Sequence, residues 1–335
     1  MATSPLAIET AGLRKLYGAK VAVADLTFAV RRGEAFGLLG PNGAGKSTCL
    51  KMLLGLARPT SGQGQMLGQP LGDLATRRRI GFLPEHFHFQ DWLSGSELLH
   101  LHGRLYGMEP SRLRRRAAEL LHRVGLESQG SKPIREYSKG MRQRIGLAQA
   151  LLNEPDIVFL DEPTSGLDPL GRFLVRDLIR EQRERGATVF LNSHLLGEVE
   201  VSCDRVAFVK QGRLLATRDL GAATAALQVR VRARVIPDSV RASALALEWT
   251  SSAPASAALA GGSGVPMPVR AETGRAAQPR PSNDLWIAHV AGPEALPPLL
   301  RLLVESGAEV SEFTPLQPSL EELFLEIVGH EEAGN

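Results

Sequence analysis

Residues 40–47 carry the sequence feature that most constrains the fold. They read Gly-Pro-Asn-Gly-Ala-Gly-Lys-Ser and match the phosphate-loop pattern G-x-x-x-x-G-K-[ST]. A strand is predicted just before the loop, at residues 34–39, and a helix is predicted from Lys46 onward. In this setting backbone N–H groups turn onto phosphate oxygens, Lys46 reaches the β- and γ-phosphates, and Ser47 offers its hydroxyl to Mg²⁺. The residues expected around the phosphates are Gly40, Asn42, Gly43, Ala44, Gly45, Lys46, Ser47 and Thr48.

The rest of the first 220 residues alternates short apolar stretches with helical patterns. Ser94 and Glu97 form a capping-box pattern at the start of one helical block. Because strands alternate with helices, the sequence predicts an α/β fold with a mostly parallel sheet that is covered on both faces. Strands are predicted at residues 27–30, 34–39, 80–83, 157–160 and 188–191. Helices are predicted at residues 46–56, in a block that opens near residue 95 and continues, after a break at residues 109–110, through a helix at 112–124, and at residues 139–152 and 169–185.

The sequence changes character near residue 220. A chain of 335 residues is long enough for about two domains of ~150 residues each. Residues 227–235 alternate apolar with basic side chains, which predicts a strand with one solvated face. Residues 251–284 are rich in Ala, Gly, Pro and Ser and are predicted to be a disordered loop. The expected domains are residues 1–220, with a helical subdomain at about 86–152, and a small α+β domain at residues 221–335.

Composition excludes several classes of protein. Lys and Arg total 39 against 36 Asp and Glu, and the charges are interspersed, so no nucleic-acid partner is expected. Cys49 and Cys203 lie far apart in predicted helical segments, which favours free thiols in a reducing compartment. No apolar stretch approaches the ~18 residues of a membrane span, and the first residues lack the pattern of an export signal. We therefore expect a chain that neither crosses a membrane nor is exported.

Two carboxylates and one histidine follow predicted strands of the sheet. Asp161 and Glu162 come directly after residues 157–160, at the carboxyl edge where α/β sheets bind ligands. Asp161 could hold Mg²⁺ through water, and Glu162 could act as the general base for an attacking water. His194 follows the next strand and could donate to a γ-phosphate. Two solvated acids at a strand end and a structural histidine remain the alternatives.

Residues 137–144 form a second candidate phosphate-binding stretch, Tyr-Ser-Lys-Gly-Met-Arg-Gln-Arg, at the start of a predicted helix. Ser138 offers a hydroxyl there, and the first N–H groups of a helix suit a phosphate. With the phosphate loop and the Asp161-Glu162 pair, this stretch makes residues 6 to about 220 resemble the ATP-binding subunits of ATP-binding cassette (ABC) transporters, in the same order of motifs. The resemblance implies a P-loop NTPase core with an antiparallel β subdomain and a helical subdomain.

The resemblance also assigns roles to further residues. It implies that Tyr17 stacks on adenine and that His194 is the switch histidine. It implies that Ser138 and Gly140 bind the γ-phosphate of an ATP held by a second copy of the chain, and that residues 165–168 cross the dimer interface. Hydrolysis with Glu162 as base and His194 as orienting group would then drive a separate membrane permease, with ATP and Mg²⁺ as cofactors. The chain would lie at the cytoplasmic face of the membrane.

Two departures from the family pattern qualify this prediction. The usual Leu-Ser-Gly-Gly-Gln is replaced at residues 137–141 by Tyr-Ser-Lys-Gly-Met, which keeps Ser138 and Gly140. Glu85 stands where the family usually has glutamine, and its carboxylate can still coordinate Mg²⁺ together with Ser47 and Asp161. Both variants resemble the exporter branch whose ATPase is a separate polypeptide, and the segment at residues 318–325 resembles the C-terminal end of that branch.

Other functions stay open at the sequence level. One is a soluble ABC ATPase that acts on nucleic acid or ribosomes, although such proteins usually carry two cassettes or long coiled-coil insertions. Another is a P-loop kinase, which the stretch at residues 137–144 and His194 disfavour. None of the motifs in the sequence identifies the transported substrate.

Overall fold

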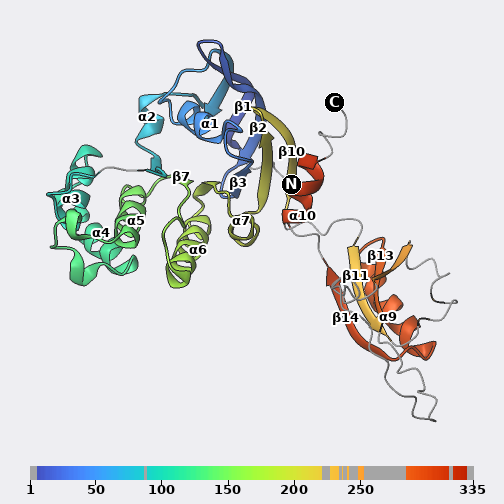
Figure 1. Ribbon diagram of the computed structural model, residues 1–335. Helices are drawn as coiled ribbons and strands as arrows, with labels where there is room; N and C mark the ends of the chain where they lie inside the picture. The colour runs from blue at the N-terminus through green and yellow to red at the C-terminus, as the bar shows by residue number, and fades with distance from the viewer. Residues whose placement is uncertain are drawn as a thin grey trace, which may run out of the picture. The chain divides into compact units, whose positions relative to one another are not determined.

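The computed structural model describes residues 6–86, 89–220, 227–233, 236, 240, 248–252, 284–316 and 320–329. The chain divides into two compact units, which Figure 1 shows with their helices and strands labelled. The first unit contains residues 1–221 and residues 320–335, and the second contains residues 222–319.

The first unit is built on a ten-stranded sheet in the order β5-β4-β1-β2-β10-β9-β3-β8-β7-β6. The five strands from β9 to β6 are parallel, whereas β1 pairs antiparallel with both β2 and β4. The predicted mostly parallel core and antiparallel β subdomain are therefore confirmed. The strands are β1 (Leu6–Tyr17), β2 (Lys20–Arg31), β3 (Ala35–Leu39), β4 (Ser61–Met66), β5 (Gln69–Pro70), β6 (Ile80–Leu83), β7 (Ile157–Asp161), β8 (Thr188–Asn192), β9 (Arg205–Lys210) and β10 (Arg213–Asp219).

Helices cover both faces of the parallel strands. Phe159 and Phe190 point into one apolar core with α1, whereas Val158 and Leu191 point into another with the helices from α3 to α7. Every residue of β3, β7 and β8 is buried, as is typical of parallel strands that are covered on both faces. The helices are α1 (Lys46–Leu53), α2 (Leu74–Arg77), α3 (Gly95–Leu105), α4 (Pro110–Arg123), α5 (Lys139–Ala150), α6 (Pro169–Glu184) and α7 (Leu196–Ser202).

Local sequence signals set the helix ends. Ser94 accepts a hydrogen bond from the Glu97 N–H while the Glu97 carboxylate accepts one from Ser94, which confirms the predicted capping box. The prediction that the helix after the phosphate loop runs to residue 56 was wrong, because α1 ends at Leu53. Gly55 follows with φ of +67°, the left-handed conformation that ends many helices at a glycine.

The second unit contains a four-stranded antiparallel sheet in the order β12-β13-β11-β14, and helix α9 packs on it. Its elements are β11 (Leu227–Ala233), β12 (Glu248–Ser252), β13 (Asp284–Val290), α9 (Leu296–Glu305) and β14 (Val310–Leu316). Val229 and Val231 are buried against Leu299 and Leu303 of α9, which confirms the alternation predicted for this strand. The loop predicted at residues 251–284 starts too early and ends too late, because Ser251, Ser252 and Asp284 pair in strands. Residues 253–283 lie outside the described residues.

The C-terminal helix α10 (Leu320–Gly329) belongs to the first unit. The Phe324 ring packs on Phe208 of β9 with ring centroids 6.1 Å apart, and the Leu320 N–H donates to the Glu200 carboxylate of α7 at 3.3 Å. The predicted second domain, residues 221–335, is therefore wrong at its C-terminal end. The apolar face of α10 packs against the core of the first unit, so the second unit is an insertion that ends at residue 319.

The structure also describes the state of the two cysteines and the character of the helices. Cys49 and Cys203 are free and buried, and burial raises the pKa of the Cys49 thiol to about 12. Among the helices that the structure describes, none combines the length and apolar character that crossing a bilayer requires.

Candidate active site

The phosphate loop at residues 40–47 joins β3 to α1 and packs closely against neighbouring backbone. A Cβ on Gly40 would lie 2.1 Å from the Val209 carbonyl oxygen, so only glycine fits at this position. Gly45 has φ of +100°, and a Cβ there would lie 2.6 Å from the Ala22 oxygen. The loop is therefore fixed by β2 and β9 on either side.

Lys46 folds back over this loop. Its Nζ donates to the Gly40 carbonyl at 2.7 Å and to the Pro41 carbonyl at 3.2 Å, and its side chain is mostly buried. Burial lowers the Lys46 pKa, while the negative charges of Glu162 and Asp161 act in the opposite direction. The ammonium thus lies at the loop, where the charges of a bound phosphate would replace its two carbonyl partners.

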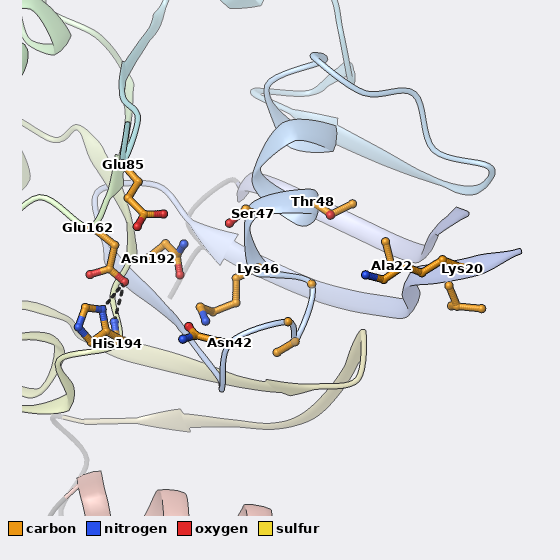
Figure 2. Close-up of a pocket in the computed structure, with 14 residues that line it drawn as sticks. Lys20, Ala22, Asn42, Lys46, Ser47, Thr48, Glu85, Glu162, Asn192 and His194 are labelled. Carbon is orange, nitrogen blue, oxygen red and sulfur yellow. Dashed lines mark hydrogen bonds and ion pairs between the residues drawn. The ribbon is translucent and has the colours of Figure 1, made fainter. Parts of the chain in front are cut away.

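The loop lines a pocket of about 410 Å³. Figure 2 shows Lys46 and Ser47 on the loop side of this pocket, with Glu85, Glu162 and Asn192 across from them. Lys20 and Ala22 of β2 extend the wall beyond the loop. The lining residues are Lys20, Val21, Ala22, Asn42, Gly43, Ala44, Gly45, Lys46, Ser47, Thr48, Glu85, Glu162, Asn192 and His194.

Glu162 follows β7 in a left-handed backbone conformation, with φ of +51°. Its N–H donates to the Asn192 carbonyl at 2.8 Å, and its carboxylate accepts the His194 N–H at 2.9 Å. The same carboxylate oxygen lies 2.8 Å from Nδ1 of the His194 ring (Figure 2). A non-glycine residue in this conformation is held there by its surroundings, as is common at functional sites. The two residues that the sequence predicted to be catalytic are therefore in direct contact.

Asp161 lies at the end of β7 and is 6% exposed. Asn192 Nδ2 donates to its carboxylate. Burial raises the Asp161 pKa, the hydrogen bond from Asn192 lowers it, and the nearby charges of Glu85 and Glu162 raise it. A carboxyl group under these conditions gains from a cation placed beside it, because the cation offsets both burial and repulsion.

The oxygen atoms around Asp161 fit Mg²⁺. Mg²⁺ prefers oxygen ligands and usually keeps several waters, with one or two carboxylates and the substrate phosphates. Ser47, Glu85 and Asp161 offer a hydroxyl and two carboxylates, and the buried Asn192 Oδ1 has no hydrogen-bond partner. Among the described residues no cluster of three or more His, Cys, Asp or Glu forms a complete metal site. The protein therefore supplies part of a coordination shell, and phosphates and water would have to complete it.

The other predicted nucleotide-binding residues lie outside the lining of this pocket. Ser138 is the N-cap of α5, where its hydroxyl accepts the Met141 N–H at 3.2 Å, and Gly140 is in the first turn. Both Ser138 and Lys139 are exposed. Tyr17 ends β1 with its side chain half-exposed and with Lys15 Nζ 5.0 Å from the ring centroid. The helix start predicted at Ser138 is thus confirmed, but one chain does not bring it to its own phosphate loop.

Comparison with known proteins identifies the family. The model of the ABC transporter family matches residues 23–165. The daunorubicin resistance ATP-binding protein DrrA3 of Streptomyces coeruleorubidus is 37% identical over 328 residues, and the match covers 96% of each chain. The chain belongs to the family of ABC transporter ATP-binding proteins. This ABC ATPase is also 41% identical over 207 residues to the Nod factor export ATP-binding protein I of Ralstonia nicotianae, covering 61% of this chain and 64% of that protein.

An uncharacterised ABC transporter ATP-binding protein of Synechocystis is 50% identical over 197 residues, which is 58% of this chain and 56% of that protein. The chain thus spans little more than half the length of this relative. Among solved structures, an ATP-binding subunit of an ABC transporter is 35% identical with a TM-score of 0.60, covering 64% of this chain and 90% of that one. A dimeric ATP-binding cassette in a post-hydrolysis state with ADP and phosphate is 27% identical with a TM-score of 0.60, covering 64% and 99%.

Three features of the site in this ABC transporter ATP-binding protein were not predicted from the sequence. Asn192 contacts both acids, through its side chain to Asp161 and its carbonyl to Glu162. Gln143 of α5 donates to the carbonyls of Glu162 and Pro163. Residues 20–22 line the pocket because β2 lies beside the loop. No local pattern marks these residues, since each owes its role to a segment distant in sequence.

Proposed function

We propose that this chain hydrolyses ATP as one half of a dimer of identical subunits, and that the dimer drives a separate membrane permease in the direction of export. The observation that carries the proposal is the division of the site. Lys46 and Glu162 line the pocket, whereas Ser138 and Gly140 lie on a different exposed surface of the chain. A second copy facing the loop would bring the Ser138 hydroxyl and the first N–H groups of α5 onto the γ-phosphate.

Each subunit would hold one ATP. The loop N–H groups, Lys46, Ser47 and Thr48 would bind the phosphates, and the exposed ring of Tyr17 would stack on adenine, an interaction worth ~1–3 kcal/mol. The dimeric assembly of the post-hydrolysis cassette with ADP and phosphate supports this arrangement. Ser47, Glu85 and Asp161 would hold Mg²⁺, which supplies charge stabilisation to the phosphates.

Glu162 would accept a proton from the water that attacks the γ-phosphate. A positioned general base contributes roughly 10²–10⁴-fold in rate. His194 donates its backbone N–H to the Glu162 carboxylate and places its ring nitrogen beside the same oxygen, so it orients the base before substrate arrives. When the dimer closes, His194 can donate to the γ-phosphate from the same position at the end of β8.

A groove of about 440 Å³ on the first unit suits the permease. Leu54, Phe82 and Phe89 give it apolar walls, and Arg77 and His102 add polar groups. Leu56, Trp92 and Leu105 are exposed by 65%, 68% and 75%. Exposed apolar side chains beside a groove mark an interaction surface. We infer that a segment of the permease binds here, at the cytoplasmic face of the membrane.

The segment between Glu85 and Trp92 would carry motion between the two sites. Glu85 lines the ATP pocket, whereas Phe89 and Gln90 line the groove, and residues 87 and 88 lie outside the described residues. The names of relatives, which include Nod factor export and daunorubicin resistance proteins, support export as the direction of transport.

The dimer is testable with Glu162→Gln, which removes the base but keeps its size. This variant should bind ATP, lose turnover and accumulate as a dimer when Mg²⁺ and ATP are present, measured by light scattering after size exclusion. Gly140→Asp in the same background should bind ATP as well but stay monomeric, because it places a carboxylate against the partner's γ-phosphate. Glu184→Gln, an exposed glutamate on α6, serves as the control. Normal turnover of Glu162→Gln, or a dimer that forms despite Gly140→Asp, would contradict the proposal.

A further inference from the structure

Gln143 connects helix α5 to the backbone of the catalytic glutamate. It is only 4% exposed, and its Nε2 donates to the Pro163 carbonyl at 2.9 Å and to the Glu162 carbonyl at 3.3 Å. A buried amide that donates to two carbonyls of one short segment helps to fix that segment, because loss of the amide would remove one hydrogen bond from each carbonyl.

The segment that Gln143 holds has an unusual backbone. Glu162 has φ of +51°, and Gly166, four positions later, has φ of +72°. The Glu162 carbonyl also accepts the Ser165 N–H at 3.1 Å. A non-glycine residue keeps such a conformation only where several contacts impose it. Gln143 is one of these contacts and comes from a helix that has no other role in the phosphate pocket.

We propose that Gln143 is a positioning residue that links the two ATP sites of the dimer through helix α5. The inference rests on the proposed dimer, in which Ser138 contacts the ATP of the partner while Glu162 acts on the ATP of its own chain. Gln143 follows Ser138 by about one and a half helical turns. Over that distance an α-helix moves as a rigid body, so a shift of its N-terminus reaches the carbonyls of Glu162 and Pro163.

The consequence is that each glutamate senses whether the other site is filled. When α5 is drawn toward the partner's γ-phosphate, the amide of Gln143 holds the peptide between Glu162 and Pro163 in the position that aims the carboxylate at the attacking water. Without the amide, ATP still binds, because Gln143 does not line the pocket. The carboxylate is then oriented only by Ser193 and His194, which follow the neighbouring strand β8.

The test compares Gln143→Met with Gln182→Met in the full-length chain. Gln182 is also a buried helical glutamine, 4% exposed, and its Oε1 has no hydrogen-bond partner, so its variant controls for loss of a buried amide. Steady-state ATP hydrolysis gives kcat, KM and the Hill coefficient for ATP. For Gln143→Met we expect kcat to fall about tenfold with KM changed less than about twofold, as for loss of two neutral hydrogen bonds. We also expect its Hill coefficient to fall toward that of independent sites.

Gln143→Glu keeps the volume but replaces the donor with an acceptor, and it should lower kcat at least as much. If Gln143→Met does not fold, Gln143→Glu provides the test instead. Folding of each variant is judged by its binding of a fluorescent ATP analogue. A kcat and a Hill coefficient equal to those of Gln182→Met would overturn the proposal while leaving the ATPase dimer intact. Absence of ATP hydrolysis in the unmodified chain would instead refute the proposed function on which this inference depends.

Discussion

Lys46 is the residue whose role the sequence predicts most directly. Its Nζ is held by the carbonyls of Gly40 and Pro41, so its charge lies at the loop before a phosphate arrives. Lys46→Ala should weaken ATP binding roughly 10- to 150-fold, because a buried charge-assisted contact to phosphate is worth roughly 1.5–3 kcal/mol. Titration with a fluorescent ATP analogue measures this, with Lys51→Ala, an exposed lysine on the same helix, as control. Unchanged affinity of Lys46→Ala would exclude the loop as the phosphate site.

Glu85 is one of the proposed Mg²⁺ ligands and stands where the family usually has glutamine. Its charge raises the Asp161 pKa, so the two carboxylates are close enough to interact. Glu85→Gln removes one negative charge, and the Mg²⁺ concentration for half-maximal ATP binding should rise roughly three- to tenfold, since ligand charge sets affinity for a hard cation. The measurement is a Mg²⁺ titration of nucleotide fluorescence, with Glu184→Gln unchanged. A lower Mg²⁺ requirement in Glu85→Gln would show that the extra carboxylate opposes binding of the metal–nucleotide complex.

The positions of the candidate site residues were predictable where these residues belong to short motifs. The loop, Asp161, Glu162 and His194 follow strands that the sequence marks clearly, and the structure brings Glu162 and His194 into contact. Asn192 and Gln143 were not predictable, because their amides act on backbone or side chains from distant segments. A single sequence carries no signal for such a contact until the strands and helices are placed in space.

At the scale of elements, α3 depends on its N-terminal cap. Ser94 is 8% exposed and forms both halves of the capping box with Glu97. Ser94→Ala should lower the free energy of unfolding by about 1 kcal/mol. Urea denaturation followed by circular dichroism measures the change, and Ser131→Ala, an exposed serine of the same subdomain, should leave the unfolding free energy within about 0.5 kcal/mol of the unmodified chain. Equal stability of the two variants would mean that the cap contributes nothing in this context.

The packing of α5 against β6 could not be predicted from the sequence. Its start at Ser138 follows from the sequence, but its approach to β6 depends on Gly81, where a Cβ would lie 1.9 Å from the Ala150 carbonyl oxygen. The sequence predicts Gly81 only as part of a strand. Glycine is required at this position because the end of a helix contacts the strand closely there. Local propensity does not encode such a contact.

At the scale of the whole molecule, the first folded unit is made of two separate stretches of the chain, residues 1–221 and 320–335. The second unit, residues 222–319, lies between them in the sequence. The change of composition near residue 220 marks the start of the second unit correctly. The sequence does not mark its end, because the amphipathic pattern of residues 319–328 predicts a helix with one apolar face but not the surface that covers it. In the structure this face packs against α7 and β9.

The return of α10 predicts that the C-terminal helix stabilises the ATP-binding unit and not the inserted one. Phe324→Ala removes a ring that packs on Phe208, and at partial burial it should cost the first unit roughly 1–3 kcal/mol. In thermal unfolding, the transition that shifts upward with ATP belongs to the first unit, because ligand stabilises only the state that binds it. That transition should move down in Phe324→Ala and stay in place in Glu321→Ala, an exposed position on the same helix. If Phe324→Ala lowers only the transition that ATP leaves unchanged, then α10 stabilises the second unit, and the domain boundary predicted from sequence is the better one.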